Sequence, residues 1–366
     1  MTELAKLRVT RRDLLRRGAL VAASPILLRS LDAWAQAKSP TKVLDFQTYA
    51  DVAKAEQEGE VVYYGHDGEA AIGDLLESFR KDFPKIKTSY VRAQTGALYA
   101  KITAERSAGR YQVDVLQLSD ISPAVDFQKK GGYEQYVSPE YSGYKAEYLS
   151  NPPGYFAWAG VTFAGIAYNR VKVKAEEAPK TWKDLLDPRW RNAISCKISA
   201  SGLQFVQWYT FTKLYGPGYW KEFAKQRPRA FDSRVQLFDR LAKGDDKVCA
   251  LAEYAAYILY RDKGAEVDFV APDDGLPATP LVVGMLDRAP HPQAARLFID
   301  WAMSSRGQAF YQSNPNLIYG SLRSDAPPMA TGKRLRDFKL LFPADFADYM
   351  ASQNTYNKEW NAMLGL

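Results

Sequence analysis

Short apolar runs alternate with amphipathic segments along the first half of the chain. The runs at residues 60–67, 86–91 and 113–118 are rich in β-branched and aromatic residues, which is typical of strands. Residues 70–83 and the segment after Thr95 repeat apolar positions every three or four residues, which predicts helices. Strands that alternate with helices indicate an α/β fold with a mainly parallel sheet.

The same alternation returns after a Pro-, Gly- and Tyr-rich connection at residues 138–154. Apolar runs predict strands, and segments with helical spacing predict helices, so this part is expected to form a second α/β unit. The expected strands are 156–168, 193–198, 248–252, 267–272 and 281–286, and the expected helices are 203–215, 235–243, the segment after 253, 291–303 and two within 327–366. Residues 38–58 are polar and are expected to be helical.

The first 37 residues have the order of a signal peptide. Thr10-Arg11-Arg12-Asp13-Leu14-Leu15-Arg16 matches the twin-arginine export motif, an apolar run follows at 18–28, and Ala35-Gln36-Ala37 offers a small-x-small cleavage site. The apolar run is shorter than the roughly 20 residues that a membrane-spanning helix needs. Residues 1–37 are therefore predicted to be removed, leaving a soluble protein in the periplasm or outside the cell.

Composition then limits the classes of function. Loss of the leader, with seven basic and three acidic residues, lowers the net charge from +7 to about +3, too little to indicate nucleic-acid binding. The remaining 329 residues favour two lobes. Cys196 and Cys249 lie in predicted buried strands and are expected to be free thiols, with a bridge as the alternative. Zinc spacing, a phosphate-binding loop and a Gly-x-Ser-x-Gly elbow are all absent from the sequence, so no permanent cofactor is expected.

Five segments, in order, resemble the extracellular solute-binding proteins of ABC importers, specifically the group that contains the ferric-ion-binding proteins. They are Tyr63 to Ala71, Gly165 to Asn169, Thr181 to Trp190, Ala250 to Tyr260, and His291 to Gln308. The resemblance covers nearly all of residues 59–325. The Trp-x-Asp-Leu-x-Asp-Pro-x-Trp pattern within Thr181 to Trp190 and the helix that ends in Gly307-Gln308 are specific in combination, and neither is decisive alone.

The resemblance implies an α/β periplasmic-binding-protein fold of type II, the two-lobed Venus flytrap with two crossing strands. Lobe one would comprise residues 38–168 and 270–366, and lobe two residues 169–269. The crossings would fall near Tyr168-Asn169 and Phe269-Ala271. Such a protein would do no chemistry. It would close on a small molecule as a monomer and deliver it to an ABC permease in the inner membrane.

The ligand is expected beyond the carboxyl ends of the strands, where helices begin and expose free N–H groups. The predicted ligand contacts are His66, Asp67, Thr95, Gly96, Ser119, Asp120, Ser199, Ser201, Glu253, Tyr254 and Tyr257. For Thr95, Ser199 and Ser201 the alternative is a plain helix cap. His291 is interpreted as a helix start.

Tyr254 is the residue that bears most on the ligand. The resemblance implies two adjacent iron-binding tyrosines at this helix start, but Ala255 occupies the second place. A small anionic or polar solute, with a ferric complex as one candidate, is therefore the main prediction. Direct ferric-ion binding through an altered set with Tyr254 and Asp67 is the first alternative. A cofactor-containing oxidoreductase exported by the twin-arginine route, and a receptor that signals, are the others.

Overall fold

A mixed ten-stranded sheet runs through the part of the chain that this computed structural model describes, residues 39–329 and 331–366. Its main path has the order β4-β3-β5-β11-β6-β9-β7-β8, with β10 beside β6 and β12 beside β11. The strands are β3 Glu60–Gly65, β4 Lys87–Arg92, β5 Val115–Leu118, β6 Ala157–Asn169, β7 Ile194–Lys197, β8 Arg229–Phe231, β9 Val248–Glu253, β10 Val267–Val270, β11 Leu276–Met285 and β12 Leu340–Leu341. The prediction of an α/β fold is confirmed.

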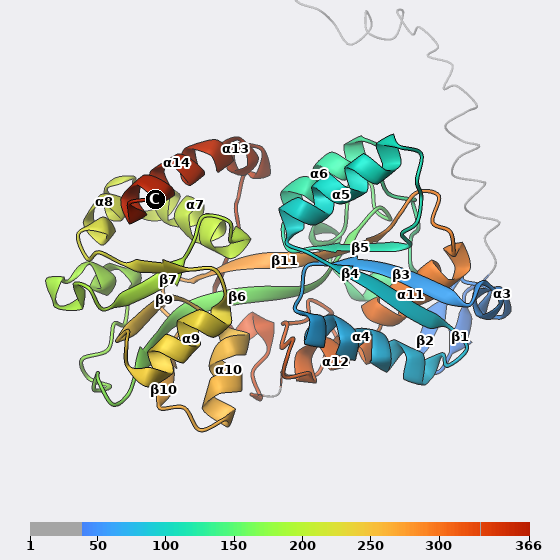
Figure 1. The fold of residues 1–366 in the computed structure, drawn as a ribbon. Helices are drawn as coiled ribbons and strands as arrows, with labels where there is room; N and C mark the ends of the chain where they lie inside the picture. Colours follow the sequence, from blue (N-terminus) through green and yellow to red (C-terminus); the bar gives the residue numbers. More distant parts are fainter. Residues whose placement is uncertain (1–38, 330) are drawn as a thin grey trace, which may run out of the picture. The chain divides into compact units, whose positions relative to one another are not determined.

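Helices cover both faces of this sheet (Figure 1). On one side of the β3–β4–β5 group lie α5 and α6, and on the other lie α4 and α12; the β7–β8–β9 group is covered by α7 and α8 above and by α9 and α10 below. The helices are α3 Val52–Glu58, α4 Glu69–Asp82, α5 Thr95–Ser107, α6 Ile121–Lys129, α7 Gly202–Tyr215, α8 Gly218–Ala224, α9 Arg234–Lys243, α10 Tyr254–Asp262, α11 Pro292–Met303, α12 Ser305–Ser313, α13 Phe346–Ala351 and α14 Gln353–Leu364.

The two long strands β6 and β11 connect the two groups of parallel strands. They pair antiparallel, β11 also pairs with β5, and β6 also pairs with β9 and β10. Nearly every residue of β6 and every residue of β11 is buried, which explains their continuous apolar sequences, because strands covered on both faces do not alternate with polar residues.

Each outer group is parallel, as predicted. β3 pairs parallel with β4 and β5, and β7 pairs parallel with β8 and β9. Helices α4, α5, α7 and α10 each begin within a few residues of the carboxyl end of a strand in these groups. This arrangement places helix N-termini at the strand ends where the sequence predicts the ligand.

Local predictions were wrong or incomplete in places. The expectation that residues 38–58 are helical holds for α3 but is wrong before it, where residues 41–48 form a hairpin of β1 Thr41–Val43 and β2 Phe46–Thr48. The buried hydroxyl of Thr48 donates to Asp300 over 2.6 Å, a long-range contact that the local pattern does not reveal. Helix α8 and strand β8 were not predicted.

The last two helices pack against the second group of strands. Tyr349 stacks on Phe205 of α7 with ring centroids 4.1 Å apart, and Trp360 of α14 lies 5.2 Å from Trp220 of α8. The sequence prediction put all of residues 270–366 in the first lobe, whereas the ring contacts of α13 and α14 are with α7 and α8. By contacts alone residues 40–366 form one compact unit, so the lobe boundaries stay a prediction.

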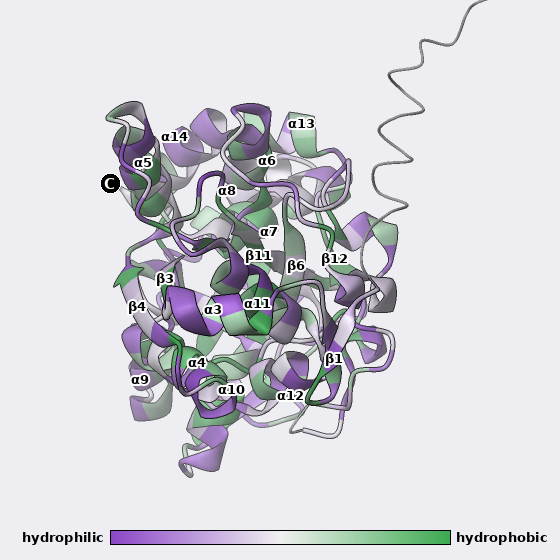
Figure 2. Cartoon of the chain, turned by 90° about the vertical axis from the view of Figure 1, so that its right-hand side faces the viewer, coloured by the Kyte–Doolittle hydropathy of each residue, from purple (hydrophilic) through white to green (hydrophobic). Residues whose placement is uncertain are grey.

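The hydrophobic residues gather on the strands and on the inward helix faces, while exposed turns such as those of α3 are hydrophilic (Figure 2). Cys196 and Cys249 are buried free thiols on the neighbouring parallel strands β7 and β9, as expected. Among the described helices none has the length and apolar character to cross a membrane. The predicted leader lies outside the described residues.

Candidate functional site

Asp67 is the centre of a buried polar group that follows β3. Its carboxylate accepts hydrogen bonds from Gln117 Nε2 over 2.8 Å and from the hydroxyl of Tyr319, and it lies 3.5 Å from His66 Nε2. Gln117 is fully buried on β5 and also contacts His66 Nδ1 at 3.2 Å. Burial and the Asp67 charge together raise the pKa of Tyr319 well above its usual range, so this phenol stays protonated and donates to the carboxylate.

Glu253 forms a second group at the end of β9. Its carboxylate binds the ammonium of Lys197, from the end of β7, and lies 3.4 Å from the guanidinium of Arg234, the first residue of α9. Burial alone would raise the pKa of Glu253, but these two cations lower it to about 2. Glu253 is therefore ionised at any physiological pH and holds both cations at the strand ends.

Arg234 connects the polar group around Asp67 with the polar group around Glu253. Its Nη2 donates to the backbone carbonyl of Asn316 over 2.9 Å, and Asn316 follows α12 beside the first group of strands. Burial alone would lower the pKa of Arg234, yet the charges of Glu253 and, less strongly, Asp67 raise it. We call Asp67, Lys197, Arg234 and Glu253 the strand-end cluster.

Polar contacts continue along the same edge through Ser119. Its hydroxyl lies 2.9 Å from Thr95 Oγ1, and its carbonyl accepts a hydrogen bond from Thr279 Oγ1 over 2.8 Å. A Cβ placed on Gly202, the first residue of α7, would sit 3.7 Å from that carbonyl. The start of α7 therefore lies against the end of β5, which brings Thr95, Ser119 and Ser201 to one place.

The helix N-termini at this edge differ in how their free N–H groups are satisfied. Asp120 caps α6 by accepting from Ser122 N over 2.9 Å, and Ser201 caps α7 by accepting from Gln204 N over 3.4 Å. The cap interpretation thus holds for Ser201, and Asp120 has the same role. Helices α4, α5 and α10 begin without a side-chain cap, so their first N–H groups are open to an anion. Gly96 lies exposed in the first turn of α5, and Ser199 is half-buried in the turn before α7.

Tyr254 and Tyr257 are not brought to the strand-end cluster. The Tyr254 ring stacks on Phe163 of β6 with centroids 5.0 Å apart, whereas Glu253 pairs with Ala164. Phe163 and Ala164 are successive residues of β6, so their side chains face opposite sides of the sheet. The Tyr254 ring, on Phe163, and the Glu253 side chain, opposite Ala164, therefore lie on opposite faces of β6. Both tyrosines instead line a cavity of about 250 Å³ with Phe269, Lys333 and Phe338 among its other walls.

The donor set at the cluster suits an anion better than a bare metal ion. A hard cation needs several free anionic oxygens, but Asp67 and Glu253 are already bound to donors, and Lys197 and Arg234 repel a cation. Within residues 39–329 and 331–366 no group of three or more His, Cys, Asp or Glu side chains could hold a metal ion.

Sequence reasoning missed four residues of this region. Lys197 ends a predicted strand, so the rule that ligands lie at strand ends could have found it. Gln117 and Arg234 carried no such signal, because one lies inside an apolar strand and the other opens an ordinary capped helix. Tyr319 lies in an irregular segment, and only the folded chain brings its hydroxyl to Asp67.

Comparison with known proteins gives a consistent picture. A family model described as "Bacterial extracellular solute-binding protein" matches residues 61–314. An uncharacterized protein of Haemophilus influenzae is 26% identical over 297 residues, covering 75% of this chain and 82% of that protein. Iron uptake protein A1 of Synechocystis sp. is 25% identical over 249 residues, covering 63% and 67%.

A solved structure supports the fold. The periplasmic binding protein AfuA from Actinobacillus pleuropneumoniae, with exogenous fructose-6-phosphate bound, superimposes with a TM-score of 0.72 and 23% identity. The match covers 84% of this chain and 99% of AfuA. At this identity the likeness concerns the fold, which is the periplasmic-binding-protein fold predicted from the sequence.

Proposed function

This chain belongs to the bacterial extracellular solute-binding proteins, and on that premise we propose that it captures a small anionic solute at the strand-end cluster. The resemblance predicted from the sequence is thereby confirmed. Proteins of this family bind rather than transform their ligands, and their partners are a small molecule and an ABC transporter. The finer statements that follow concern which solute this chain binds, and where.

One observation carries the proposal: positive charge and open helix N-termini meet at the same strand ends. Lys197 and Arg234 lie there beside Glu253, and α4, α5 and α10 begin there without side-chain caps. A phosphate or carboxylate group would accept from these N–H groups and from the two cations. The hydroxyls of Thr95 and Ser119 could then hydrogen-bond the polar body of the solute.

The comparisons leave two kinds of ligand to weigh. AfuA was solved with fructose-6-phosphate, and a Synechocystis relative is named an iron uptake protein. A sugar phosphate, a carboxylate or an anionic ferric chelate would each meet the donors described. A bare ferric ion would not, because Tyr254 faces the other side of β6 and the remaining carboxylates are engaged.

Capture would require the two strand groups to separate and close again. The hydrogen bond from Arg234 to the Asn316 carbonyl joins them, and it would break when a solute enters and reform, or be replaced, when the site closes. We place the mature, monomeric protein in the periplasm, exported by the twin-arginine route and docking on an inner-membrane permease. Nucleic acid is not among its proposed partners.

A thermal-shift screen tests the proposal. Fructose 6-phosphate, citrate and ferric citrate serve as anionic probes, fructose as the uncharged control, and ferric chloride as the source of bare iron. A ligand at about 100 times its Kd stabilises the folded state by about 3 kcal/mol, which a melting curve resolves. At least one anion is expected to raise Tm while fructose does not.

Two variants locate the effect. Lys197→Met should remove most of the shift, whereas Lys243→Met, at the exposed far end of α9, should keep it. An equal response in both variants would place the anion elsewhere. Stabilisation by ferric chloride alone, with a visible tyrosinate-to-iron absorption band, would establish direct iron binding instead.

A further inference from the structure

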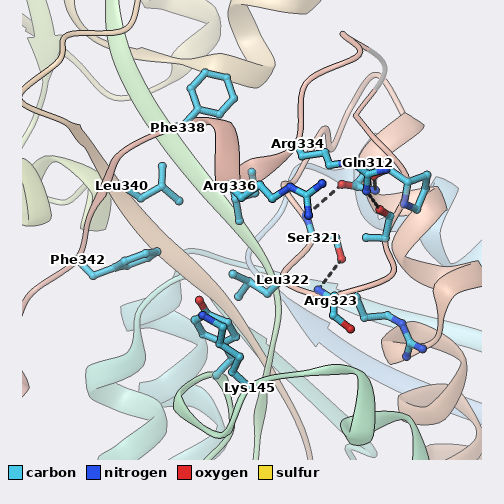
Figure 3. A pocket seen from close by; sticks show the side chains of 15 residues that line it. Lys145, Gln312, Ser321, Leu322, Arg323, Arg334, Arg336, Phe338, Leu340 and Phe342 are labelled. Atoms are coloured by element: carbon cyan, nitrogen blue, oxygen red, sulfur yellow. Dashed lines mark hydrogen bonds between the residues drawn. The ribbon is translucent and has the colours of Figure 1, made fainter.

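A second cavity lies on the face of β6 opposite the strand-end cluster. It has a volume of about 460 Å³ and lies between the segment 321–327, the segment 334–342, and Lys145 with Tyr148 (Figure 3). The Phe338 ring, which forms part of its wall, lies 4.8 Å from Phe163, on the face that carries Tyr254. The cavity is therefore separate from the proposed solute site.

The charge of its lining is one-sided. Four of the residues that line it are Lys or Arg, and the described lining contains no carboxylate. Two of these cations are already engaged: Arg323 pairs with Glu140 and Asp325 at 2.6 and 2.7 Å, and Arg334 donates to a backbone carbonyl.

The other two cations are available to a ligand. Arg336 is exposed and, within the described residues, makes no hydrogen bond or ion pair. Lys145 is 3.7 Å from Glu147, and both side chains are mostly exposed, so this pair contributes little energy. The rim of the cavity thus presents one unpaired guanidinium and one weakly paired ammonium.

The opposite wall is apolar and well supported. Leu322, Leu340 and Phe342 are half-buried there, which leaves part of each side chain facing the cavity. Phe342 packs on Trp158 at 5.4 Å, and Trp158 packs on Tyr148 at 5.5 Å. A wall held by packed aromatic rings keeps its shape. The volume of the cavity lies in the range of small-molecule sites.

From this combination we infer that the cavity is a second binding site, for a small organic anion with a flat apolar body such as an aromatic carboxylate or sulfonate. The apolar body would cover Leu322, Leu340 and Phe342, and the acid group would pair with Arg336 and Lys145. A free inorganic phosphate would leave the apolar wall exposed and would bind weakly. The site acts independently of the solute held at the strand-end cluster.

Anilinonaphthalene sulfonate is the probe, since it joins a flat aromatic body to a sulfonate. Isothermal titration of the purified protein is expected to show one site. Arg336→Glu should weaken binding by at least about tenfold through loss of a charge-assisted contact, and Arg336→Lys should recover most of it. Arg191→Glu, an exposed arginine outside the cavity, controls for the change in net charge.

The Lys197→Met variant separates this inference from the proposed function. Unchanged probe binding in Lys197→Met, together with weaker binding in Arg336→Glu, supports the second site. Equal affinity in Arg336→Glu and the wild type would overturn it, as would an absence of binding. A loss of affinity in Lys197→Met equal to that in Arg336→Glu would also overturn it, because the probe would then occupy the strand-end cluster.

Discussion

Replacing Glu253 by Gln removes the charge that holds Lys197 and Arg234 together. The side chain is almost fully buried, and the two cations lower its pKa from an ordinary 4.5 to about 2, against the opposing effect of burial. A depressed carboxyl pKa contributes stability that is present above the unfolded-state pKa and is lost as the pH falls through the folded-state value. The difference corresponds to about 3 kcal/mol at pH 7 and about 1 kcal/mol at pH 3.

Urea unfolding of ligand-free protein, followed by tryptophan fluorescence at pH 7, 5 and 3, measures this difference. Glu253→Gln should lower the free energy of unfolding most at pH 7, and the gap to the wild type should narrow towards pH 3. The matched control is Glu222→Gln, which breaks the exposed pair with Lys225 and should cost less than about 1 kcal/mol throughout. A loss at pH 7 no larger than that of the control, or one that stays constant down to pH 3, would refute the reasoning.

Three further outcomes are expected. Tyr254→Phe should change the affinity for the anionic probes, measured by thermal shift, by less than about twofold, because the Tyr254 ring stacks on Phe163 away from the cluster. A larger loss of affinity would show that Tyr254 contacts the ligand. Burial raises the pKa of Asp300 to about 7. The neutral carboxyl therefore contributes its full stabilisation of the folded state below pH 4, and this stabilisation is lost as the pH rises through 7. Asp300→Asn should therefore gain in Tm relative to the wild type between pH 5 and pH 8, and a constant offset would contradict this. Replacement of Arg11 and Arg12 by lysines should retain the precursor in the cytoplasm, and cell fractionation that finds normal amounts in the periplasm would exclude the twin-arginine route.

The architecture could be predicted because the spacing of apolar residues along the chain indicates which residues are buried. The runs that became β3, β5, β6 and β9 are mostly apolar and almost entirely buried, which is what a sheet covered on both faces requires. The pattern did not place α13 and α14, because their rings are equally suited to any apolar surface. Their attachment to α7 and α8 depends on complementary aromatic shapes such as Phe205 against Tyr349.

The candidate site was predicted in part. Strand-end reasoning found Asp67, Ser119 and Glu253, since a residue that follows a buried parallel strand must lie at the carboxyl edge of the sheet. It did not decide the direction of Tyr254, because Tyr254 is the first residue of α10 and the alternation of strand residues does not fix where its side chain points. Arg234 and Tyr319 were beyond reach, since their roles come from contacts with residues far away in the chain, Asn316 and Asp67.

Native mass spectrometry of the protein purified from its own periplasm is the most direct test of the account. The wild type is expected to carry one small anion, retained in Lys243→Met and lost in Lys197→Met at equal protein concentration. An adduct with the mass of iron alone, or a bound molecule whose occupancy does not change in Lys197→Met, would contradict capture of an anion at the strand-end cluster.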